Sequence, residues 1–388
     1  MRSWARVAVP RIAGEAPPLW LSGSGSVAGA PTGAARLYVC GITPYDATHL
    51  GHAATYLAFD LLQRQWLDRG IDVDYVQNVT DVDDPLLARA ASTGVEWSEL
   101  AAAQAERFRT DMTALRIVPP REWCSVTESM TDIIDLIEML GDAAYLVEHD
   151  VYFDIDGWLG TQLEERTMLS LFAEHGGDPD RPGKRNPLDC LLWRAARAAE
   201  PSWESPWGPG RPGWHIECAA IAHARLGPAI DVIGGGSDLA FPHHAMSAAE
   251  TAAATGGPAA RTYLHTGMVA YAGAKMAKSD GNLVLVGDLL DAGHDPMAIR
   301  LALLGHHYRE DWEWHDGELA AAEQRLAQWR SGIEEESPDA ALVGDGLVGE
   351  VRARLADDLD APGALAVIDD WRGPLPAEAI DALLGVRL

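Results

Sequence analysis

Residues 36–53, RLYVCGITPYDATHLGHA, decide the fold, because they join a buried strand to a helix through a short loop. The apolar run 36–40 is typical of a strand, and Gly41 predicts a turn at its end. Apolar residues then recur at helical spacing from Thr48 to Arg69, and a second strand is expected over 73–79. In such a βαβ unit, ligands bind where the carboxyl ends of the strands meet the helix N-terminus.

A second strand-and-turn unit lies far along the chain, at 229–238 (AIDVIGGGSD). A helix is predicted over 243–254 and a strand over 263–271. The residues between the two units, about 113–213, mix helical patterns with loops rich in Pro and Gly. The sequence therefore predicts an α/β fold, a doubly wound (Rossmann-type) parallel sheet with a large insertion between its halves.

The chain divides into three predicted parts. Residues 1–34 form an N-terminal arm, irregular or a short strand laid on the core. Residues 35–310 form the α/β domain that contains the insertion. Residues 311–388 form a C-terminal helical domain, in which 319–333 is amphipathic and later prolines interrupt the helices.

The charge of the chain limits its partners. There are 58 acidic and 30 basic residues, which give a formal net charge of −28. Such a balance disfavours a sequence-independent grip on a polyanion, so no nucleic-acid partner is expected. The N-terminal stretch has no unbroken apolar segment, so we expect a cytoplasmic protein without a membrane association. We also expect a monomer, although charge and composition do not determine the oligomeric state.

Four cysteines at irregular positions do not make a disulfide framework. Cys124 and Cys190 lie among apolar or irregular neighbours and are interpreted as structural. Cys40, Cys218 and His243 are far apart in sequence, so each alone is better explained as a core residue. If all three meet at the top of the sheet, however, they leave zinc an open position for a substrate thiolate, and such a site would reject serine.

Two short motifs suggest phosphate chemistry. His49-Leu-Gly-His52 stands at the expected helix start, where free amides favour an anion and both imidazoles can face one phosphate; a pair of capping or surface histidines is the alternative. Lys275-Met-Ala-Lys278 follows a predicted strand and could neutralise pyrophosphate, or could be a solvated charge pair. The chain has only one other lysine, Lys184, which favours a functional role.

Two further segments gave weaker signals. Gly234-Gly-Gly-Ser-Asp238 follows a strand and would let the backbone approach a ligand closely, although such turns are often only turns. Trp214-His-Ile-Glu-Cys218 could begin a strand or a helix, so its pattern alone does not assign it a function.

Taken in order, five segments resemble the cysteinyl-tRNA synthetase superfamily: YVCGITPYDATHLGHA (38–53), NVTDVDD (78–84), GRPGWHIEC (210–218), GGGSDLAFPHH (234–244) and KMAKS (275–279). HLGH and KMAKS are similar to the HIGH and KMSKS motifs of class I adenylating enzymes. The resemblance covers about residues 36–310. Within the superfamily the chain is most similar to the ligases of mycothiol biosynthesis that join L-cysteine to glucosaminyl-inositol, above all through EHGGDP (174–179).

The C-terminal region supports the same choice. Residues 310–388 contain 19 acidic and 6 basic residues. A tRNA anticodon-binding domain would be larger and more basic.

The resemblance implies a class I adenylating catalytic domain over 35–310, with ATP as substrate, magnesium, and one zinc ion per chain. Zinc would be held by Cys40, Cys218 and His243, and adenylation would be served by His49, His52, Lys275 and Lys278. The cysteinyl-adenylate pocket would be lined by Cys40, Gly41, Ile42, Thr43, Thr55, Asn78, Val79, Thr80, Trp214, Gly236, Ser237, Asp238 and Val269.

Three positions depart from the pattern of the superfamily. Ser247 stands where the synthetases have a fourth zinc ligand, a Glu, which is consistent with a three-ligand site. Ala277 replaces Ser in the KMSKS-like motif, and Ala245 stands where Glu is usual. Both lysines are retained, so we expect activity to persist.

The function implied is the ATP-dependent ligation of L-cysteine to the amine of glucosaminyl-inositol through a cysteinyl-adenylate, with release of AMP and pyrophosphate. Two alternatives stay open at this point. A short cysteinyl-tRNA synthetase would share the first step and end on a tRNA ribose hydroxyl. An inactive paralogue would bind cysteine or nucleotide as a regulator.

Overall fold

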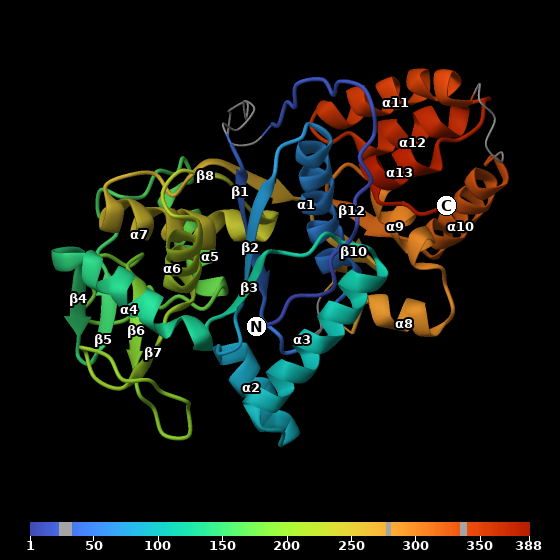
Figure 1. The fold of residues 1–388 in the computed structure, drawn as a ribbon. Coiled ribbons are helices and arrows are strands. Elements are labelled where there is room, and N and C mark those ends of the chain that lie inside the picture. Colours follow the sequence, from blue (N-terminus) through green and yellow to red (C-terminus); the bar gives the residue numbers. More distant parts are fainter. Residues whose placement is uncertain (23–32, 277–280, 334–339) are drawn as a thin grey trace.

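The computed structural model describes residues 1–22, 33–276, 281–333 and 340–388, without the side chains of Lys275 and of residues 340–345. A five-stranded parallel sheet in the order β3-β2-β1-β8-β9 occupies its centre (Figure 1). The strands are β1 (Ala35–Ile42), β2 (Val73–Val79), β3 (Glu122–Ser125), β8 (Ile230–Gly236) and β9 (Ala260–Thr266). The strand order reverses beside β1, which pairs with both β2 and β8, so the doubly wound sheet is confirmed.

Helices cover both faces of this sheet because the buried strand residues alternate between two cores. Leu37 and Val39 of β1 belong to the core under α1 (Leu50–Asp68), whereas Tyr38 and Cys40 belong to the core under α4, α6 and α7. The helices of the second face are α4 (Met130–Met139), α6 (Trp214–Leu226) and α7 (Ala245–Thr255); α3 (Trp97–Ala114) packs into the α1 core, and α2 (Asp84–Thr93) precedes it. The segment 214–218, left undecided by its sequence, is therefore the start of a helix.

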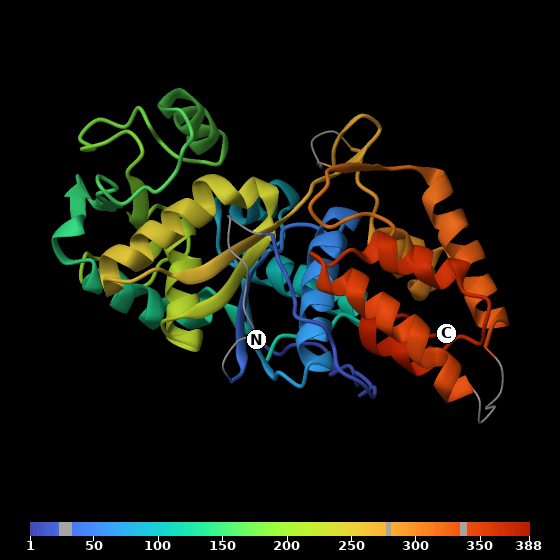
Figure 2. The ribbon, with the colours of Figure 1, turned by 90° about the horizontal axis from the view of Figure 1, so that it is seen from above.

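A second, antiparallel sheet lies at one end of the molecule (Figures 1 and 2). Its strands, with the helix that accompanies them, are β4 (Ala144–Val147), β5 (Asp150–Phe153), α5 (Glu165–Glu174), β6 (Cys190–Ala195) and β7 (Gly210–Pro212). The expected insertion, 113–213, supplies this sheet but is not wholly separate from the main sheet, because β3 pairs with β2. The division into three domains remains a prediction.

The prediction of one strand over 263–271 is wrong, because these residues form two strands in different sheets. β9 ends at Thr266, and β10 (Val269–Tyr271) pairs instead with β11 (Ala274–Lys275) and β12 (Trp312–Trp314). The break lies at Gly267, whose amide donates to the Tyr308 carbonyl at 2.7 Å. A Cβ there would lie 2.1 Å from the Glu310 carbonyl oxygen, so only glycine fits this close approach.

The region after β10 is mainly helical and packs beside α1 at the other end of the molecule (Figures 1 and 2). Its helices are α8 (Val286–Asp291), α9 (Pro296–Leu304), α10 (Asp316–Ser331), α11 (Ala340–Ala356), α12 (Ala361–Asp370) and α13 (Ala377–Leu384). The amphipathic pattern predicted over 319–333 therefore falls largely on α10.

The N-terminal arm crosses the core and reaches the C-terminal helices. Trp4 is buried and its indole donates to the Ile117 carbonyl at 2.8 Å. Trp20 accepts from the Asp358 amide and donates its own amide to Ala356, which forms a short parallel bridge at the end of α11. The arm thus joins the two ends of the sequence.

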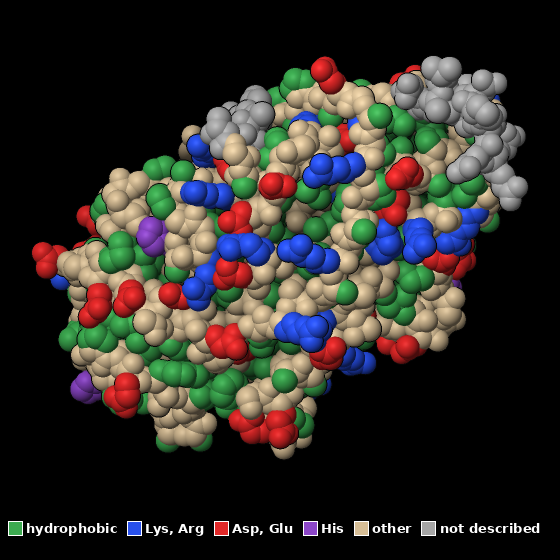
Figure 3. All heavy atoms as spheres, viewed as in Figure 1, with side chains coloured by type: hydrophobic (Ala, Val, Ile, Leu, Met, Phe, Trp, Pro, Cys, Tyr) green, Lys and Arg blue, Asp and Glu red, His purple; other side chains and the backbone are tan. Residues whose placement is uncertain are grey.

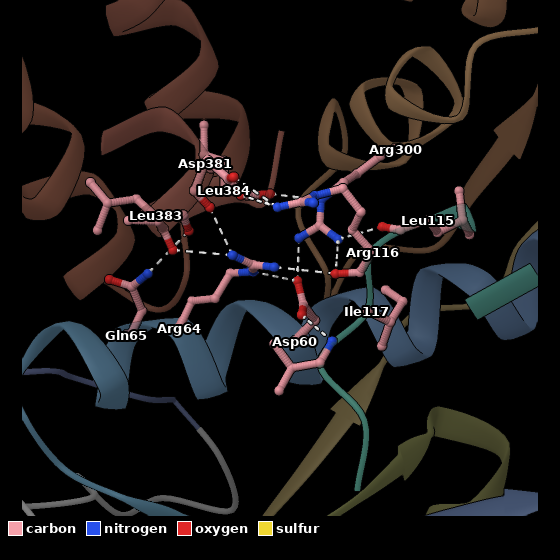
Figure 4. A network of polar contacts seen from close by, with 12 residues as sticks. Asp60, Arg64, Gln65, Leu115, Arg116, Ile117, Arg300, Asp381, Leu383 and Leu384 are labelled. Carbon is pink, nitrogen blue, oxygen red and sulfur yellow. Dashed lines mark hydrogen bonds and ion pairs between the residues drawn. The ribbon is translucent and has the colours of Figure 1, made fainter. Parts of the chain in front are cut away.

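A buried ionic network holds α13 against α1 (Figure 4). Asp60, fully buried on α1, accepts from Arg64 at 2.8 Å and also from Arg300 of α9. The two guanidinium groups then donate to carbonyls at the end of α13: Arg64 to Asp381 at 2.7 Å and Arg300 to Leu384 at 2.7 Å. The Asp381 carbonyl also accepts from the Gly385 amide at 2.9 Å, so the arginines add a second donor at this helix end from another part of the chain.

Charge is mixed on the surface. On the face drawn in Figure 3, the side chains of Lys and Arg lie among those of Asp and Glu and form no continuous basic area. Arg225, for example, pairs with Glu122 and Asp132. Among the described residues, none of the helices is both long and apolar enough to cross a membrane.

Candidate active site

A cavity of about 600 Å³ opens where β1, β2 and β8 end, beside the reversal of strand order. Most predicted pocket, metal and adenylation residues line it: Cys40, Gly41, Ile42, Thr43, His49, His52, Thr55, Asn78, Thr80, Trp214, Cys218, Gly236, Asp238, His243 and Val269. Val79 and Ser237 do not line it; Val79 is fully buried in the core behind Asn78. This is the crevice in which doubly wound folds bind ligands.

The deep end of the cavity gathers sulfur and imidazole. Cys40 comes from the end of β1, Cys218 from the second turn of α6, and His243 from the turn that precedes α7. All three are buried, and their ligand atoms lie within 4.8 Å of one another. The two Sγ atoms are 3.7 Å apart.

This geometry fits a zinc ion. Two sulfurs on a tetrahedral zinc, each bonded at about 2.3 Å, lie about 3.8 Å apart. The hydrogen bond with the Cys218 thiol, together with burial, raises the pKa of Cys40, so a cation would be needed to hold Cys40 as a thiolate. Ser247 donates its hydroxyl to the His215 carbonyl at 2.9 Å, so it is engaged with the backbone. Among the described residues the group has three potential ligands.

Three further histidines surround this group, and the sequence reasoning missed their roles. His215 Nδ1 lies 3.1 Å from His243 Nδ1, which leaves Nε2 of His243 for a metal. His244 Nε2 lies 3.2 Å from Cys40 Sγ, and its Nδ1 lies 2.8 Å from His265 Nε2. The neighbouring histidines in WHIEC and FPHH were a visible signal for the first two. His265 gave none, because a single histidine in a strand carries no pattern.

Burial keeps these rings neutral. It lowers the pKa of His215 to about 3, with His175 adding to the effect, and the pKa of His244 to about 3, with His265 adding to it. A neutral imidazole has one donor and one acceptor nitrogen, so in each contact between two rings one ring donates and the other accepts. The contacts of each ring with its neighbour therefore set the orientation of every imidazole in the cluster.

The wall beside the thiols is polar and tightly packed. The Gly41 amide donates to the Asn78 side chain at 2.7 Å, and a Cβ at Gly41 would lie 1.6 Å from the Asn78 carbonyl oxygen. Asn78 in turn donates to Thr80 at 3.1 Å, and Thr80 donates to Glu217 at 3.2 Å. Glycine at position 41 thus lets β1 and β2 meet at the cavity edge.

The outer end of the cavity carries the HLGH motif. His49 is the N-cap of α1 and its Nδ1 accepts from the Gly51 amide at 3.1 Å. The rings of His49 and His52 are stacked, with centroids 3.8 Å apart. Both line the cavity at a helix N-terminus, where an anion is favoured.

Only the first part of the KMAKS motif lies within the described residues. The backbone of Lys275 lies in β11, and Met276 is buried and lines the cavity. The Lys275 side chain and all of Lys278 lie outside the described residues, as does Ala277. Of the departures from the motifs, Ala245 is the first residue of α7.

The rim of the cavity lies between the end with the two thiols and the end with the HLGH motif. The indole of Trp214 is stacked on His243, with centroids 4.4 Å apart. Thr55 donates to the Gly51 carbonyl at 3.2 Å and lies 2.9 Å from the Thr266 hydroxyl. A Cβ at Gly236 would lie 2.5 Å from a carboxylate oxygen of Asp238, which explains the glycine beside this residue.

Comparisons with known proteins agree with this architecture. Residues 28–324 match the family described as tRNA synthetases class I (C) catalytic domain. Among solved structures, Mycobacterium tuberculosis methionyl-tRNA synthetase in complex with methionyl-adenylate superimposes with a TM-score of 0.61, over 91% of this chain and 82% of that one, at 18% identity. The protein is therefore a class I synthetase-like enzyme; the structural likeness itself shows only the fold.

Comparison with curated relatives identifies a narrower family within the class I synthetase-like enzymes. The chain is 56% identical to the L-cysteine:1D-myo-inositol 2-amino-2-deoxy-alpha-D-glucopyranoside ligase of Thermobispora bispora, over 100% of both chains. It is 56% identical to the ligase of that name from Catenulispora acidiphila, over 96% of this chain and 91% of that one, and 55% identical to that of Streptosporangium roseum, over 100% of both. The chain belongs to this ligase family.

Proposed function

We propose that the protein joins L-cysteine to the amine of glucosaminyl-inositol with ATP, in mycothiol biosynthesis. The observation that carries the proposal is the meeting of Cys40, Cys218 and His243 at the deep end of a cavity whose outer end holds the HLGH motif. One end suits the sulfur of cysteine and the other suits the phosphates of ATP.

The first step forms cysteinyl-adenylate. The cysteine carboxylate attacks the α-phosphate of ATP, and pyrophosphate leaves. His49 and His52, at the N-terminus of α1, stabilise the charge that builds on the phosphate oxygens, and Lys275 and Lys278 of the KMAKS motif serve the same charge. Magnesium would accompany ATP.

Cysteine is oriented by the deep end. Zinc held by Cys40, Cys218 and His243 would bind the substrate sulfur and so favour cysteine over serine, whose hydroxyl is a poor ligand. Trp214, stacked on His243, closes the side of this site, and Asp238 lies on the rim, where it could accept from the cysteine ammonium group.

The second step forms an amide. The amine of glucosaminyl-inositol attacks the activated carbonyl, its proton is lost, and AMP leaves. A short cysteinyl-tRNA synthetase would end instead on a tRNA hydroxyl. The full-length similarity to the ligases and the acidic C-terminal region favour the amino sugar. We propose further that the protein acts as a cytoplasmic monomer and takes no nucleic acid.

The test is AMP release by the purified, zinc-loaded protein given ATP and cysteine, with either glucosaminyl-inositol or tRNA as acceptor. AMP that forms only with the amino sugar, together with a new amide, supports the proposal. AMP that forms only with tRNA assigns the protein to the synthetases. Serine in place of cysteine is the control for the sulfur site, and no cysteine-dependent exchange of pyrophosphate into ATP would indicate an inactive paralogue.

A further inference from the structure

A second cavity, of about 1260 Å³, adjoins the first. It lies between the start of α2 and the loop 174–181 that follows α5, and its floor comes from β6 and β7. The two cavities share four lining residues: Thr43, Tyr45, His175 and Trp214. A molecule in the second cavity could therefore reach a carbonyl group held in the first.

The loop of this cavity is firmly braced. Lys184, buried to 2% side-chain exposure, donates to the Asp178 carboxylate at 3.0 Å and to the Pro187 carbonyl at 2.8 Å. Tyr152 of β5 also donates to the Asp178 carboxylate. The one lysine outside the KMAKS motif is thus structural, and it shapes the cavity wall.

The lining suits a hydroxylated cation better than a phosphate chain. It contains six carboxylates and four guanidinium groups: Asp83, Asp84, Asp150, Glu174, Asp178 and Asp180, with Arg181, Arg194, Arg197 and Arg211. Groups of both kinds bind sugar hydroxyls, because a hydroxyl both donates and accepts. The excess of carboxylates attracts a protonated amine and repels a tRNA end.

Among the described residues, three of the six carboxylates in this lining form no ion pair, and of the three Asp83 is the one that acts on Tyr45 of the shared wall. Asp84 pairs with Arg211 and, at 2.6 Å, with Arg194. Its neighbour Asp83 accepts from the Asp84 amide at 2.7 Å and, in the described part of the chain, forms no ion pair. Burial raises the pKa of Asp83 to about 6, which Arg211 and Arg194 offset only in part. Burial, Asp46 and Asp83 together raise the pKa of Tyr45, a residue of the shared wall, so the Asp83 carboxylate lies near that wall.

We propose that this second cavity binds the acceptor amino sugar, and that Asp83 holds its ammonium group beside the shared wall. The inference rests on the proposed function, since it assigns the second substrate of that reaction. The sugar and inositol hydroxyls lie against the charged groups of β6, β7 and the loop 174–181. The ammonium group passes its proton to the Asp83 carboxylate, and the free amine reaches the first cavity past Thr43 and Trp214.

The experiment separates the two half-reactions in the full-length, zinc-loaded protein. Asp83→Asn removes the charge and keeps a good N-cap for α2, because Asn and Asp cap helices about equally. Cysteine-dependent exchange of pyrophosphate into ATP, measured without acceptor, should stay within about twofold of the unchanged protein. The KM for glucosaminyl-inositol in AMP release should rise at least about tenfold.

Two further variants complete the test. Asp295→Asn makes the same change at the N-cap of α9, outside both cavities, and should alter neither measurement. Asp180→Asn, on the exposed loop, should raise the acceptor KM about threefold with exchange unchanged.

The outcomes are distinct. An unchanged acceptor KM in Asp83→Asn and Asp180→Asn would overturn the assignment of the cavity. Loss of exchange in Asp83→Asn would also overturn it, because the residue would then serve adenylation or the fold. Absence of exchange in the unchanged protein would instead contradict the proposed function itself.

Discussion

The molecule buries two polar clusters equally deeply, and they differ in how completely the protein satisfies them. In the network of Asp60, Arg64 and Arg300, the carboxylate and both guanidinium groups find partners in the chain. In the group of Cys40, Cys218 and His243, the side chains face a cavity. A buried polar group that is closed by the protein stabilises the fold, whereas one that faces a cavity is available to a ligand.

Cys218→Ser should have the largest effect, and this effect should be on activity and zinc binding, not on the stability of the fold. Serine is a poor zinc ligand, so we expect the kcat/KM for cysteine in AMP release to fall about 10³-fold, equivalent to about 4 kcal/mol. Zinc content by atomic absorption should fall with it. Cys124→Ser, a buried cysteine outside the group, is the matched control and should keep both. Full zinc content and activity in Cys218→Ser would refute the distinction between the clusters.

Asp60→Asn should have the next largest effect, on stability alone. It leaves two buried guanidinium groups without their counter-charge, so the free energy of unfolding should fall by about 3 kcal/mol. Urea denaturation measures this change, and kcat at a temperature where the variant is folded should be nearly unchanged. Glu106→Gln, which breaks an exposed ion pair on α3, serves as the control and should leave the unfolding midpoint in place.

His244→Phe should have an intermediate effect on metal affinity. It removes the contact with Cys40 while keeping an aromatic ring in place. Because groups that orient metal ligands typically contribute 10–100-fold to affinity, zinc should bind about 10-fold more weakly. Competition with a chelator measures this. An unchanged affinity would show that His244 packs against the thiol without orienting it.

The smallest expected effect is on the pH dependence of stability, which reports on the Asp60 network. Burial alone would raise the pKa of Asp60, but Arg300 and Arg64 outweigh it and hold the pKa below its usual value. A lowered pKa means that the stabilisation is present above the unfolded value, about 4, and is lost as the pH falls through the folded value. The difference in urea midpoint between the unchanged protein and Asp60→Asn should therefore be constant from pH 5 to 7 and shrink below pH 4.

Local patterns predicted much of the fold and of the site. The βαβ unit and the helix start at His49 follow from spacing and turn residues within a few positions. The meeting of Cys40, Cys218 and His243 came from the resemblance to a family, because no local spacing joins residues so far apart.

What the sequence did not reveal depends on distant contacts. The break at Gly267 is imposed by the chain at Tyr308 and Glu310, which no local pattern announces. Asp60 and Arg64 lie on a helix face that periodicity alone assigns to solvent or core without naming Arg300 as their partner. His265 became visible only when the fold placed it beside His244.

The Asp60 network also joins parts of the chain that are synthesised at different times. The ribosome makes α1 early, and Arg64 and Arg300 have acceptors in Asp60 and in the carbonyls of Leu115 and Arg116, but their further acceptors at residues 381–384 are made much later. Until those residues emerge, the two guanidinium groups lack the hydrogen bonds that the end of α13 supplies, and buried donors without partners cost free energy. The network therefore ties the full stability of the core around α1 to a helix whose Asp381 lies 317 residues beyond Arg64 in the sequence.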